Sequence, residues 1–95
     1  MYHAHRTKKF EKSLIKLYRS GKLSKSIISD IEYIIDTLKE GKILPKKFKD
    51  HSLLGNLRSY KECHIRHDLL LVYEILEEEL VLVLMDIGPH SYVFN

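Results

Sequence analysis

Residues 60–87 read YKECHIRHDLLLVYEILEEELVLVLMDI, and this stretch decides the fold. It contains three apolar runs, which span 60–67, 69–76 and 80–87. Each run has the length and the aliphatic and aromatic composition that are typical of a β-strand. The connections His67-Asp68 and Glu77-Glu78-Glu79 are too short for a crossover helix, so consecutive strands are expected to run antiparallel. The stretch therefore predicts a three-stranded meander.

Upstream of the meander, two segments have the periodicity of amphipathic helices. The first is expected between Thr7, a suitable N-cap, and Gly21, a suitable stop, with apolar residues at Phe10, Leu14, Leu17 and Tyr18. The second follows the pattern i, i+1, i+4, i+7, i+8 and i+11 at Ile27, Ile28, Ile31, Ile34, Ile35 and Leu38. Ser24 or Ser26 can cap its start, and Gly41 its end. The two segments thus predict a two-helix hairpin.

The N-terminal residues 2–6 alternate in a way that is compatible with a short strand, with His3 and His5 on one face. The apolar stripe of the helical hairpin needs a partner surface, and a sheet is the expected one. With 95 residues, 44% of them hydrophobic, the chain suffices for a single core. We therefore expect one α+β domain over residues 1–95. It consists of an N-terminal strand, a two-helix hairpin and a three-stranded antiparallel meander, with the helices packed on one face of roughly four strands.

Charge is distributed unevenly along the chain, although the net charge is only +3. Residues 42–49 carry four lysines and no acid, whereas residues 74–79 carry four glutamates. Such local asymmetry favours nucleic acid or an acidic protein as a partner. A solvated basic loop is an equally simple interpretation of the lysines.

Cys63 is the single cysteine, and its place in an apolar strand indicates a small buried residue in a reducing cytoplasm. A catalytic thiolate is the less favoured interpretation. No apolar run approaches the roughly 18 residues that a membrane span needs, and the N-terminus lacks a signal-peptide core. We therefore expect a cytoplasmic protein with no membrane partner.

Three histidines of the second half lie where their side chains can converge. His51 is in a basic loop, His64 in the first strand of the meander and His90 beyond the last strand, with Asp68 in a turn nearby. Histidine exchanges protons near neutral pH. Basic residues flank the three histidines, namely Lys46, Lys47, Lys49, Arg58 and Arg66. The pattern favours proton transfer beside a polyanion, whereas each histidine taken singly is as readily a surface residue.

Strand alternation sorts the residues of the segment 60–67. It places Glu62, His64 and Arg66 on one face and Cys63 on the other. The same rule weighs against a metal site, because His64 and His67 project to opposite faces. The sequence also has no Cys cluster and no His-Glu-x-x-His motif. We therefore expect neither a metal nor another cofactor.

Three motifs recur in order in the second half: Lys-Asp-His-x-Leu at 49–53, Glu-Cys-His-Ile at 62–65 and Gly-x-His-Ser-x-x-Phe at 88–94. Each is weak alone, but together they resemble the YafQ branch of the RelE-type toxins of bacterial toxin–antitoxin pairs. The resemblance covers the whole chain in length and element order. It implies the RelE-like fold.

The resemblance also implies a function. RelE-type toxins are mRNA interferases, endoribonucleases that enter the ribosomal A site, cut messenger RNA without a metal and so inhibit translation. The implied partners are a cognate antitoxin, which wraps the toxin until it is degraded, and the 70S ribosome with its 16S RNA and bound message. Free of antitoxin, the protein is expected to be a monomer.

The resemblance carries the family's catalytic residues over to His51, His64, Asp68 and His90. The expected substrate-binding residues are Lys46, Lys47, Lys49, Arg58, Glu62, Arg66 and Phe94. Metal-free RNA cleavage needs a base for the 2′-hydroxyl, an acid for the 5′-oxygen and positive charge near the phosphorane. Histidines suit the first two roles and the basic residues the third, while Phe94 suits base stacking. The sequence does not decide which histidine is the acid.

The chain departs from the family pattern at Asp86-Ile87, where relatives usually have Arg-Thr, and at Leu69 and Pro89. The first change places a negative charge close to the expected scissile phosphate. Arg66, expected on the face of His64, is positioned to compensate for it. The alternative function is a catalytically weakened protein of the same fold that binds an antitoxin or RNA. A third possibility, an RNA-binding adaptor unrelated to toxins, rests only on the basic loop.

Overall fold

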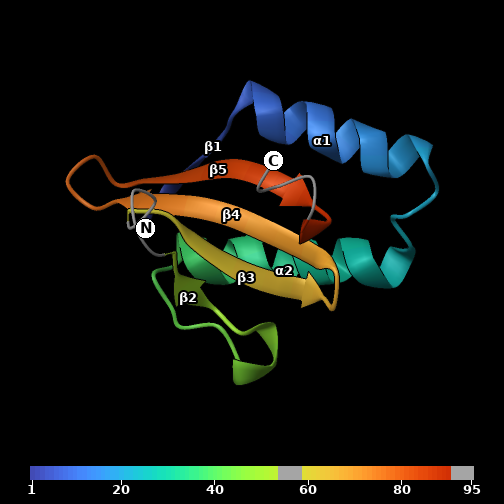
Figure 1. Ribbon diagram of the computed structural model, residues 1–95. Coiled ribbons are helices and arrows are strands. Elements are labelled where there is room, and N and C mark those ends of the chain that lie inside the picture. Colours follow the sequence, from blue (N-terminus) through green and yellow to red (C-terminus); the bar gives the residue numbers. More distant parts are fainter. Residues whose placement is uncertain (54–58, 91–95) are drawn as a thin grey trace.

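A computed structural model of the chain describes residues 1–53 and 59–90 (Figure 1). In chain order the elements are β1 (His3–Arg6), α1 (Lys8–Arg19), α2 (Lys25–Lys39), the short 3-10 helix η1 (Lys46–Phe48), β2 (His51–Ser52), β3 (Lys61–Arg66), β4 (Leu69–Leu76) and β5 (Val81–Gly88). The predicted α+β class and the predicted order of strand, two helices and meander are confirmed. None of the described helices is both long enough and apolar enough to cross a membrane.

The strands form a mixed sheet in the order β1-β5-β4-β3-β2. β3, β4 and β5 are the predicted antiparallel meander, and β1 pairs in parallel with β5. The sheet has five strands where roughly four were expected, because His51 and Ser52 pair with Glu62 and Lys61 of β3. The expectation of a loop at His51 was therefore wrong. A two-residue strand is too short to give an alternation pattern in the sequence.

Both helices cover the same face of the sheet, as predicted. In Figure 1, α2 lies behind the strands and α1 runs along the β5 side. One apolar cluster joins both helices to the sheet and contains Phe10, Leu17, Ile31, Ile34, Leu38, Cys63, Leu71, Tyr73, Leu82, Leu84 and Ile87. Among residues 1–53 and 59–90, no helix covers the opposite face (Figure 1). His64 lies on that face, because its neighbour Cys63 points into the apolar cluster.

Hydrogen bonds from the cap residues fix the start of each helix. The Thr7 side chain accepts from the backbone N–H of Phe10 at 3.1 Å, and the Ser24 side chain accepts from Ile27 at 3.2 Å. The structure thus selects Ser24 over Ser26 as the second cap. The predicted stops hold as well, because Gly21 and Gly41 follow the helices with φ of 72° and 74°, a conformation that favours glycine.

Two bulges interrupt the regular ladder of the meander. On β3 the pairing shifts between His64 and Arg66, and on β5 Met85 is the extra residue between Leu84 and Asp86. A bulge locally twists its strand and re-aims the side chains that follow. The first bulge lies next to Arg66 and the second next to Asp86, and both of these side chains contact a helix.

Candidate active site

The first two predicted histidines lie side by side on the open face of the sheet. Their ring centroids are 6.2 Å apart. Glu62 lies with them, since its Oε1 is 2.9 Å from His51 Nε2 and 3.9 Å from His64 Nε2. The register explains this grouping, because His51 pairs directly with Glu62 and His64 follows two residues along the same strand. His51, on the short edge strand β2, is thus brought into contact with Glu62 of the meander.

Both ring nitrogens of His51 have polar partners. Nδ1 lies 2.7 Å from the carbonyl oxygen of Lys49, and Nε2 faces Glu62. A carbonyl oxygen only accepts, so Nδ1 carries a hydrogen. At Nε2, an imidazolium N–H can donate to the carboxylate, or a carboxyl O–H can donate to the imidazole. His51 and Glu62 are therefore close enough to pass a proton between them.

Glu62 is unusual for an acidic residue because it is only 6% exposed. Among the side chains that the structure describes, its Oε2 is the buried polar atom without a hydrogen-bond partner. Leaving a polar atom buried and unpaired is costly, and native proteins keep such atoms for a purpose. This oxygen is left to pair with a polar group of a ligand, which makes Glu62 a candidate residue of the site.

Asp68 ties the segment that carries His90 to the same end of the sheet. It lies in the turn between β3 and β4, and its Oδ1 accepts from the backbone N–H of His90 at 3.1 Å. The ladder agrees with this placement, because His64 pairs with Leu70 and Leu70 pairs with Gly88, two residues before His90. Asp68 is thus a turn residue, and its contact with His90 is to the backbone N–H.

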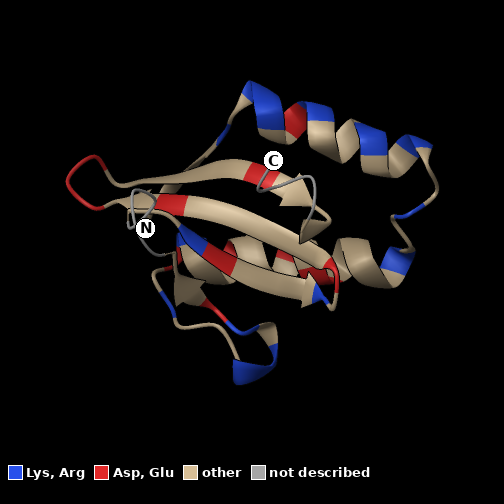
Figure 2. Cartoon of the chain, in the orientation of Figure 1, with Lys and Arg blue, Asp and Glu red and all other residues tan. Residues whose placement is uncertain are grey.

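We call the group of His51, Glu62, His64 and His90 the histidine row. The lysines of the basic loop flank its β2 end. Lys46 and Lys47 belong to η1, and Lys49, in a left-handed conformation with φ of 49°, presents its carbonyl to His51 (Figure 2). Lys47 also stacks its ammonium group over the Phe48 ring at 5.0 Å. These three lysines therefore surround the segment from which His51 enters the site.

Arg66 points to α2 and not along the face of His64. Its Nη1 pairs with Asp30 and also donates to the carbonyl of Ile65, while Nη2 donates to Ser26 Oγ at 2.9 Å. The bulge after His64 causes this change of direction. The expectation that His64 and Arg66 share a face was therefore wrong, because strict alternation fails at a bulge. The predicted site residues Arg58 and Phe94 lie outside the described residues.

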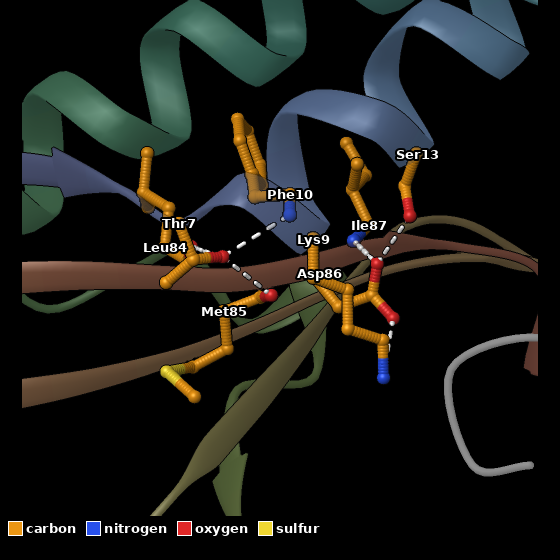
Figure 3. Close-up of polar contacts among 8 residues, drawn as sticks. All are labelled: Thr7, Lys9, Phe10, Ser13, Leu84, Met85, Asp86 and Ile87. Atoms are coloured by element: carbon orange, nitrogen blue, oxygen red, sulfur yellow. Dashed lines mark hydrogen bonds and ion pairs between the residues drawn. The ribbon is translucent and has the colours of Figure 1, made fainter.

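Asp86 is buried and faces α1, contrary to the expectation that its charge lies beside the scissile phosphate (Figure 3). Its Oδ1 accepts from Ser13 Oγ at 2.6 Å and from the backbone N–H of Ile87 at 2.8 Å. Its Oδ2 lies 3.4 Å from Lys9 Nζ. The carboxylate is thus fully engaged within the protein, and Lys9 offsets its charge. Nothing in the sequence near residue 86 points to Ser13 and Lys9, which are more than 70 residues earlier in the chain.

Cys63 is buried beneath the site and is not a nucleophile. Burial, and next the negative charges of Asp50 and Glu62, raise the pKa of its thiol to about 12. A thiol with this pKa carries almost no thiolate at neutral pH. Tyr73, on the neighbouring strand, has its pKa raised by burial and by its hydrogen bond to Asp50. The sequence-based interpretation of Cys63 as a small core residue agrees with its place in the apolar cluster.

The described residues do not offer a metal centre. Across 1–53 and 59–90, no three His, Cys, Asp or Glu side chains are grouped so as to hold an ion. The His51–Glu62–His64 group is the nearest arrangement, but both histidine contacts are made to a single carboxylate oxygen. The chemistry that this arrangement supports is proton transfer between closely spaced imidazole and carboxyl groups.

The chain has relatives of known name. Residues 2–95 match the protein family described as "Bacterial toxin of type II toxin-antitoxin system, YafQ". A Haemophilus influenzae protein that bears the YafQ toxin name is 33% identical over 76 residues, which cover 77% of this chain and 72% of that protein. The mRNA interferase toxin YafQ of Escherichia coli is 26% identical over 86 residues, which cover 80% of this chain and 91% of that protein.

Solved structures agree with this match. A metal-bound toxin from Helicobacter pylori is 36% identical and superposes with a TM-score of 0.88, covering 99% of this chain and 100% of that chain. Escherichia coli YafQ, in its complex with DinJ, superposes with a TM-score of 0.83 at 20% identity over the whole of both chains. At that identity the second likeness concerns the fold alone.

Proposed function

Because the chain belongs to the YafQ family of toxins of bacterial type II toxin–antitoxin systems, we propose that it is an mRNA interferase that cuts messenger RNA on the ribosome. The family assignment confirms the resemblance drawn from the sequence motifs. The proposed activity is that of an endoribonuclease, and it takes its name from the Escherichia coli relative. Its consequence for the cell is an arrest of translation.

The observation that carries this proposal is the row of proton-exchanging groups on the open face of the sheet. His51 Nε2 contacts Glu62 Oε1, His64 adjoins them, and Asp68 holds the backbone of His90 at the end of the same row. RNA cleavage by the 2′-hydroxyl needs a base and an acid on opposite sides of one phosphate. Closely spaced imidazole and carboxyl groups can supply both roles.

The reaction that we propose is an internal transesterification. A base takes the proton of the ribose 2′-hydroxyl, the 2′-oxygen attacks phosphorus, and the bond from phosphorus to the 5′-oxygen breaks. An acid gives its proton to that 5′-oxygen, which leaves a 2′,3′-cyclic phosphate on one product and a 5′-hydroxyl on the other. Lys46, Lys47 and Lys49 supply positive charge to the RNA backbone.

The contacts of His51 suggest how the acid and base roles are divided. Its Nδ1 is committed to the Lys49 carbonyl, and its Nε2 is placed to exchange a proton with Glu62. Such a pair suits the general acid. His64 and His90 are then the candidates for the base, and Asp68 acts on His90 as a positioning residue.

We propose that the reaction uses no metal, although two Helicobacter pylori toxins of 33% and 36% identity have been solved with metal bound. The described residues group no set of ligands for an ion, so no step of the mechanism is routed through one. The test is 1,10-phenanthroline, which removes transition metals and leaves the magnesium of the ribosome in place. Cleavage that stops on chelation and returns with zinc or copper would refute this part of the proposal.

An antitoxin is the proposed protein partner, as for Escherichia coli YafQ, which forms a complex with DinJ. An apolar groove between α1 and α2, about 570 Å³ in volume, supports this because it leaves Ile15 and Tyr18 47% and 71% exposed. Exposed apolar grooves of this kind are typical sites for a partner segment. Released from the antitoxin, the protein is proposed to act as a monomer in the bacterial cytoplasm.

The alternative function, a weakened protein that only binds, was based on Asp86-Ile87 in place of the usual Arg-Thr and on whether the three histidines converge. The Asp86 carboxylate is turned to α1 and engaged by Ser13 and Lys9, and His51 and His64 lie side by side, and both observations favour the enzyme. We therefore retain the enzyme as the proposal. The adaptor unrelated to toxins is excluded by the family assignment.

The experiment that tests the proposed function is induced expression in bacteria of the parent, of His90→Ala and of His5→Ala. His5 is an exposed histidine of β1 and serves as the matched control. The proposal predicts growth arrest with the parent and His5→Ala, and normal growth with His90→Ala at equal soluble protein. Arrest by all three proteins would show that toxicity does not require the proposed site.

A further inference from the structure

Asp50, the residue before His51, has its carboxylate held from two strands of the meander. Its Oδ1 accepts from the hydroxyl of Tyr73 on β4, and its Oδ2 lies 3.1 Å from Lys61 Nζ on β3. The Asp50 side chain is 17% exposed, so these contacts are largely shielded from water. None of the roles assigned above uses this carboxylate. We call the contacts of Asp50 with Tyr73 and Lys61 the Asp50 anchor.

The partners of Asp50 are themselves fixed in the sheet. Tyr73 is fully buried in the apolar cluster, and it pairs directly with Lys61 across the ladder of β3 and β4. Lys61 Nζ also lies 5.9 Å from the centroid of the Tyr73 ring. Burial, and next the hydrogen bond to Asp50, raise the pKa of Tyr73, so its hydroxyl keeps its hydrogen and remains a donor to the carboxylate.

The strand that carries His51 is short and exposed. β2 consists of His51 and Ser52 at the edge of the sheet, and both residues are exposed. Beyond these two pairs with β3, the N–H of Leu53 donates to the Tyr60 carbonyl at 2.9 Å. Edge segments with few buried contacts and exposed backbone hydrogen bonds open more readily than the centre of a sheet. A buried side-chain contact one residue before His51 is therefore a main support of β2.

The Asp50 anchor and the His51 ring lie on opposite faces of the sheet. Asp50 reaches Tyr73 in the apolar cluster, whereas the His51 ring lies 6.2 Å from the His64 ring on the face opposite that cluster. Because Asp50 and His51 are neighbours in the chain, the anchor determines where His51 Nε2 stands, 2.9 Å from Glu62 Oε1. Misplacing a reacting group by about 1 Å costs about 100-fold in rate.

We propose that Asp50 is a positioning residue that holds His51 in place against Glu62. Tyr73 and Lys61 are the groups through which the sheet holds Asp50. This role rests on the proposed function, because the reaction that His51 serves is the cleavage of RNA. The anchoring of β2 itself is independent of that reaction and is measured without RNA.

The lysines of η1 are held by a different contact. Phe48, the last residue of η1, is buried, and its ring centroid lies 6.2 Å from that of Tyr33 on α2. Loss of the Asp50 anchor is therefore expected to displace His51 while Lys46 and Lys47 keep their place. The chemical step should slow, and the binding of message should change little.

Tyr73→Phe tests the proposal, because it removes the donor to Asp50 and keeps the aromatic ring in the core. Tyr2→Phe is the matched control, since Tyr2 is another buried tyrosine of the same apolar cluster. The first measurement is amide hydrogen exchange by NMR, at the Leu53 N–H beside β2 and at the Leu71 N–H in the central strand β4. The second is single-turnover cleavage of ribosome-bound message at increasing protein concentration. It gives a maximal rate and a half-saturating concentration.

Loss of a hydrogen bond to a charged group should speed exchange at Leu53 by about tenfold, with exchange at Leu71 unchanged. The maximal rate should fall by about 10-fold to 100-fold, with the half-saturating concentration within about twofold of the parent. Tyr2→Phe should match the parent in both measurements. Unchanged exchange at Leu53, or faster exchange with an unchanged maximal rate, would overturn the proposal. An equal rise at Leu53 and Leu71 would overturn it too, because it would indicate a general loss of stability.

Two changes at Asp50 test whether Tyr73 acts through its carboxylate. Asp50→Asn keeps an oxygen that accepts from Tyr73, so it should retain most of the maximal rate that Asp50→Ala loses. Asp50→Ala combined with Tyr73→Phe should lose no more than Asp50→Ala alone, because both changes remove the same contact. Additive losses would show that Tyr73 acts by another route and would overturn the proposal. If Asp50→Ala does not fold, Tyr73→Phe alone decides.

The proposed function is scored separately, on the parent protein. A parent that cuts no ribosome-bound message fails the proposed function, and hydrogen exchange at Leu53 still decides whether Asp50 anchors β2. A parent that cuts the message, together with a Tyr73→Phe variant that cuts it at the same maximal rate, fails only the role of Asp50. The two failures are therefore distinguishable.

Discussion

His51 Nε2 lies 2.9 Å from Glu62 Oε1, and this contact joins an exposed histidine of the sheet edge to a buried carboxyl. Because Nδ1 of His51 contacts the Lys49 carbonyl, Nε2 is the ring nitrogen placed to exchange a proton with Glu62. Such a pair is placed to act as a general acid next to His64. Its consequences for catalysis are directly measurable.

Glu62→Gln removes the carboxyl group and keeps the shape of the side chain. Loss of a general acid typically costs about 100-fold to 10,000-fold, so we expect kcat for message cleavage to fall by about 100-fold or more. Glu74→Gln, the same change on the neighbouring β4, is expected to cleave as the parent does. Single-turnover cleavage of ribosome-bound message is the measurement. Equal activity of the two variants would remove Glu62 from the mechanism.

Asp86→Ala is expected to destabilise the fold and to spare the chemistry. The change leaves Ser13 Oγ and the Ile87 N–H without their acceptor and Lys9 without its partner, which costs about 1–3 kcal/mol of unfolding free energy. Asp86→Asn keeps an acceptor oxygen for Ser13 and should lose less. Urea unfolding measures both values. A drop in cleavage without a drop in stability would mean that Asp86 meets RNA after all.

Arg66→Ala tests the reassignment of Arg66 from substrate to α2. Its guanidinium contacts Asp30 and Ser26, and both charged partners are partly exposed, so screening limits the loss to about 0.5–1 kcal/mol. Cleavage is expected to stay within twofold of the parent. A double-mutant cycle with Asp30→Ala should show that the two losses are coupled. If cleavage falls while stability holds, Arg66 belongs to the substrate-binding set as first expected.

Alkaline pH should unfold the protein partly through Cys63. The thiol titrates at its ordinary value of 9.0 in the unfolded chain and at about 12 in the folded one. Between these values the unfolded state holds fewer protons, so stability is lost as pH rises, at about 1.4 kcal/mol per pH unit for this one group. Below pH 9 the contribution is intact. Cys63→Ala should therefore show a shallower decline between pH 9 and 10.5 in urea unfolding, and parallel curves would contradict the raised pKa.

The regular part of the fold was predictable because its signals are local. The three apolar runs of the meander, the apolar stripe of α2 and the caps at Thr7 and Gly21 depend on neighbours within a few residues. The sequence offered Ser24 and Ser26 as equally suitable N-caps of α2, and only the structure decided between them.

What the sequence did not predict depends on partners far along the chain. The two-residue strand at His51 exists because β3 offers it an edge, and the direction of Arg66 follows from a bulge and from Asp30 on α2. Asp86 finds Ser13 at a separation of 73 residues. The candidate histidines were named from the sequence pattern and the family motifs, but the contact of His51 with Glu62 and Lys49 depends on the pairing of β2 with β3.

The most direct test of the account is primer extension on a defined message bound to purified ribosomes, with and without the protein. The account predicts cuts that need both the ribosome and the parent protein, fall within codons of the A site and vanish with His90→Ala but not with His5→Ala. Cuts that persist in His90→Ala, or a parent that leaves the ribosome-bound message whole, would contradict it.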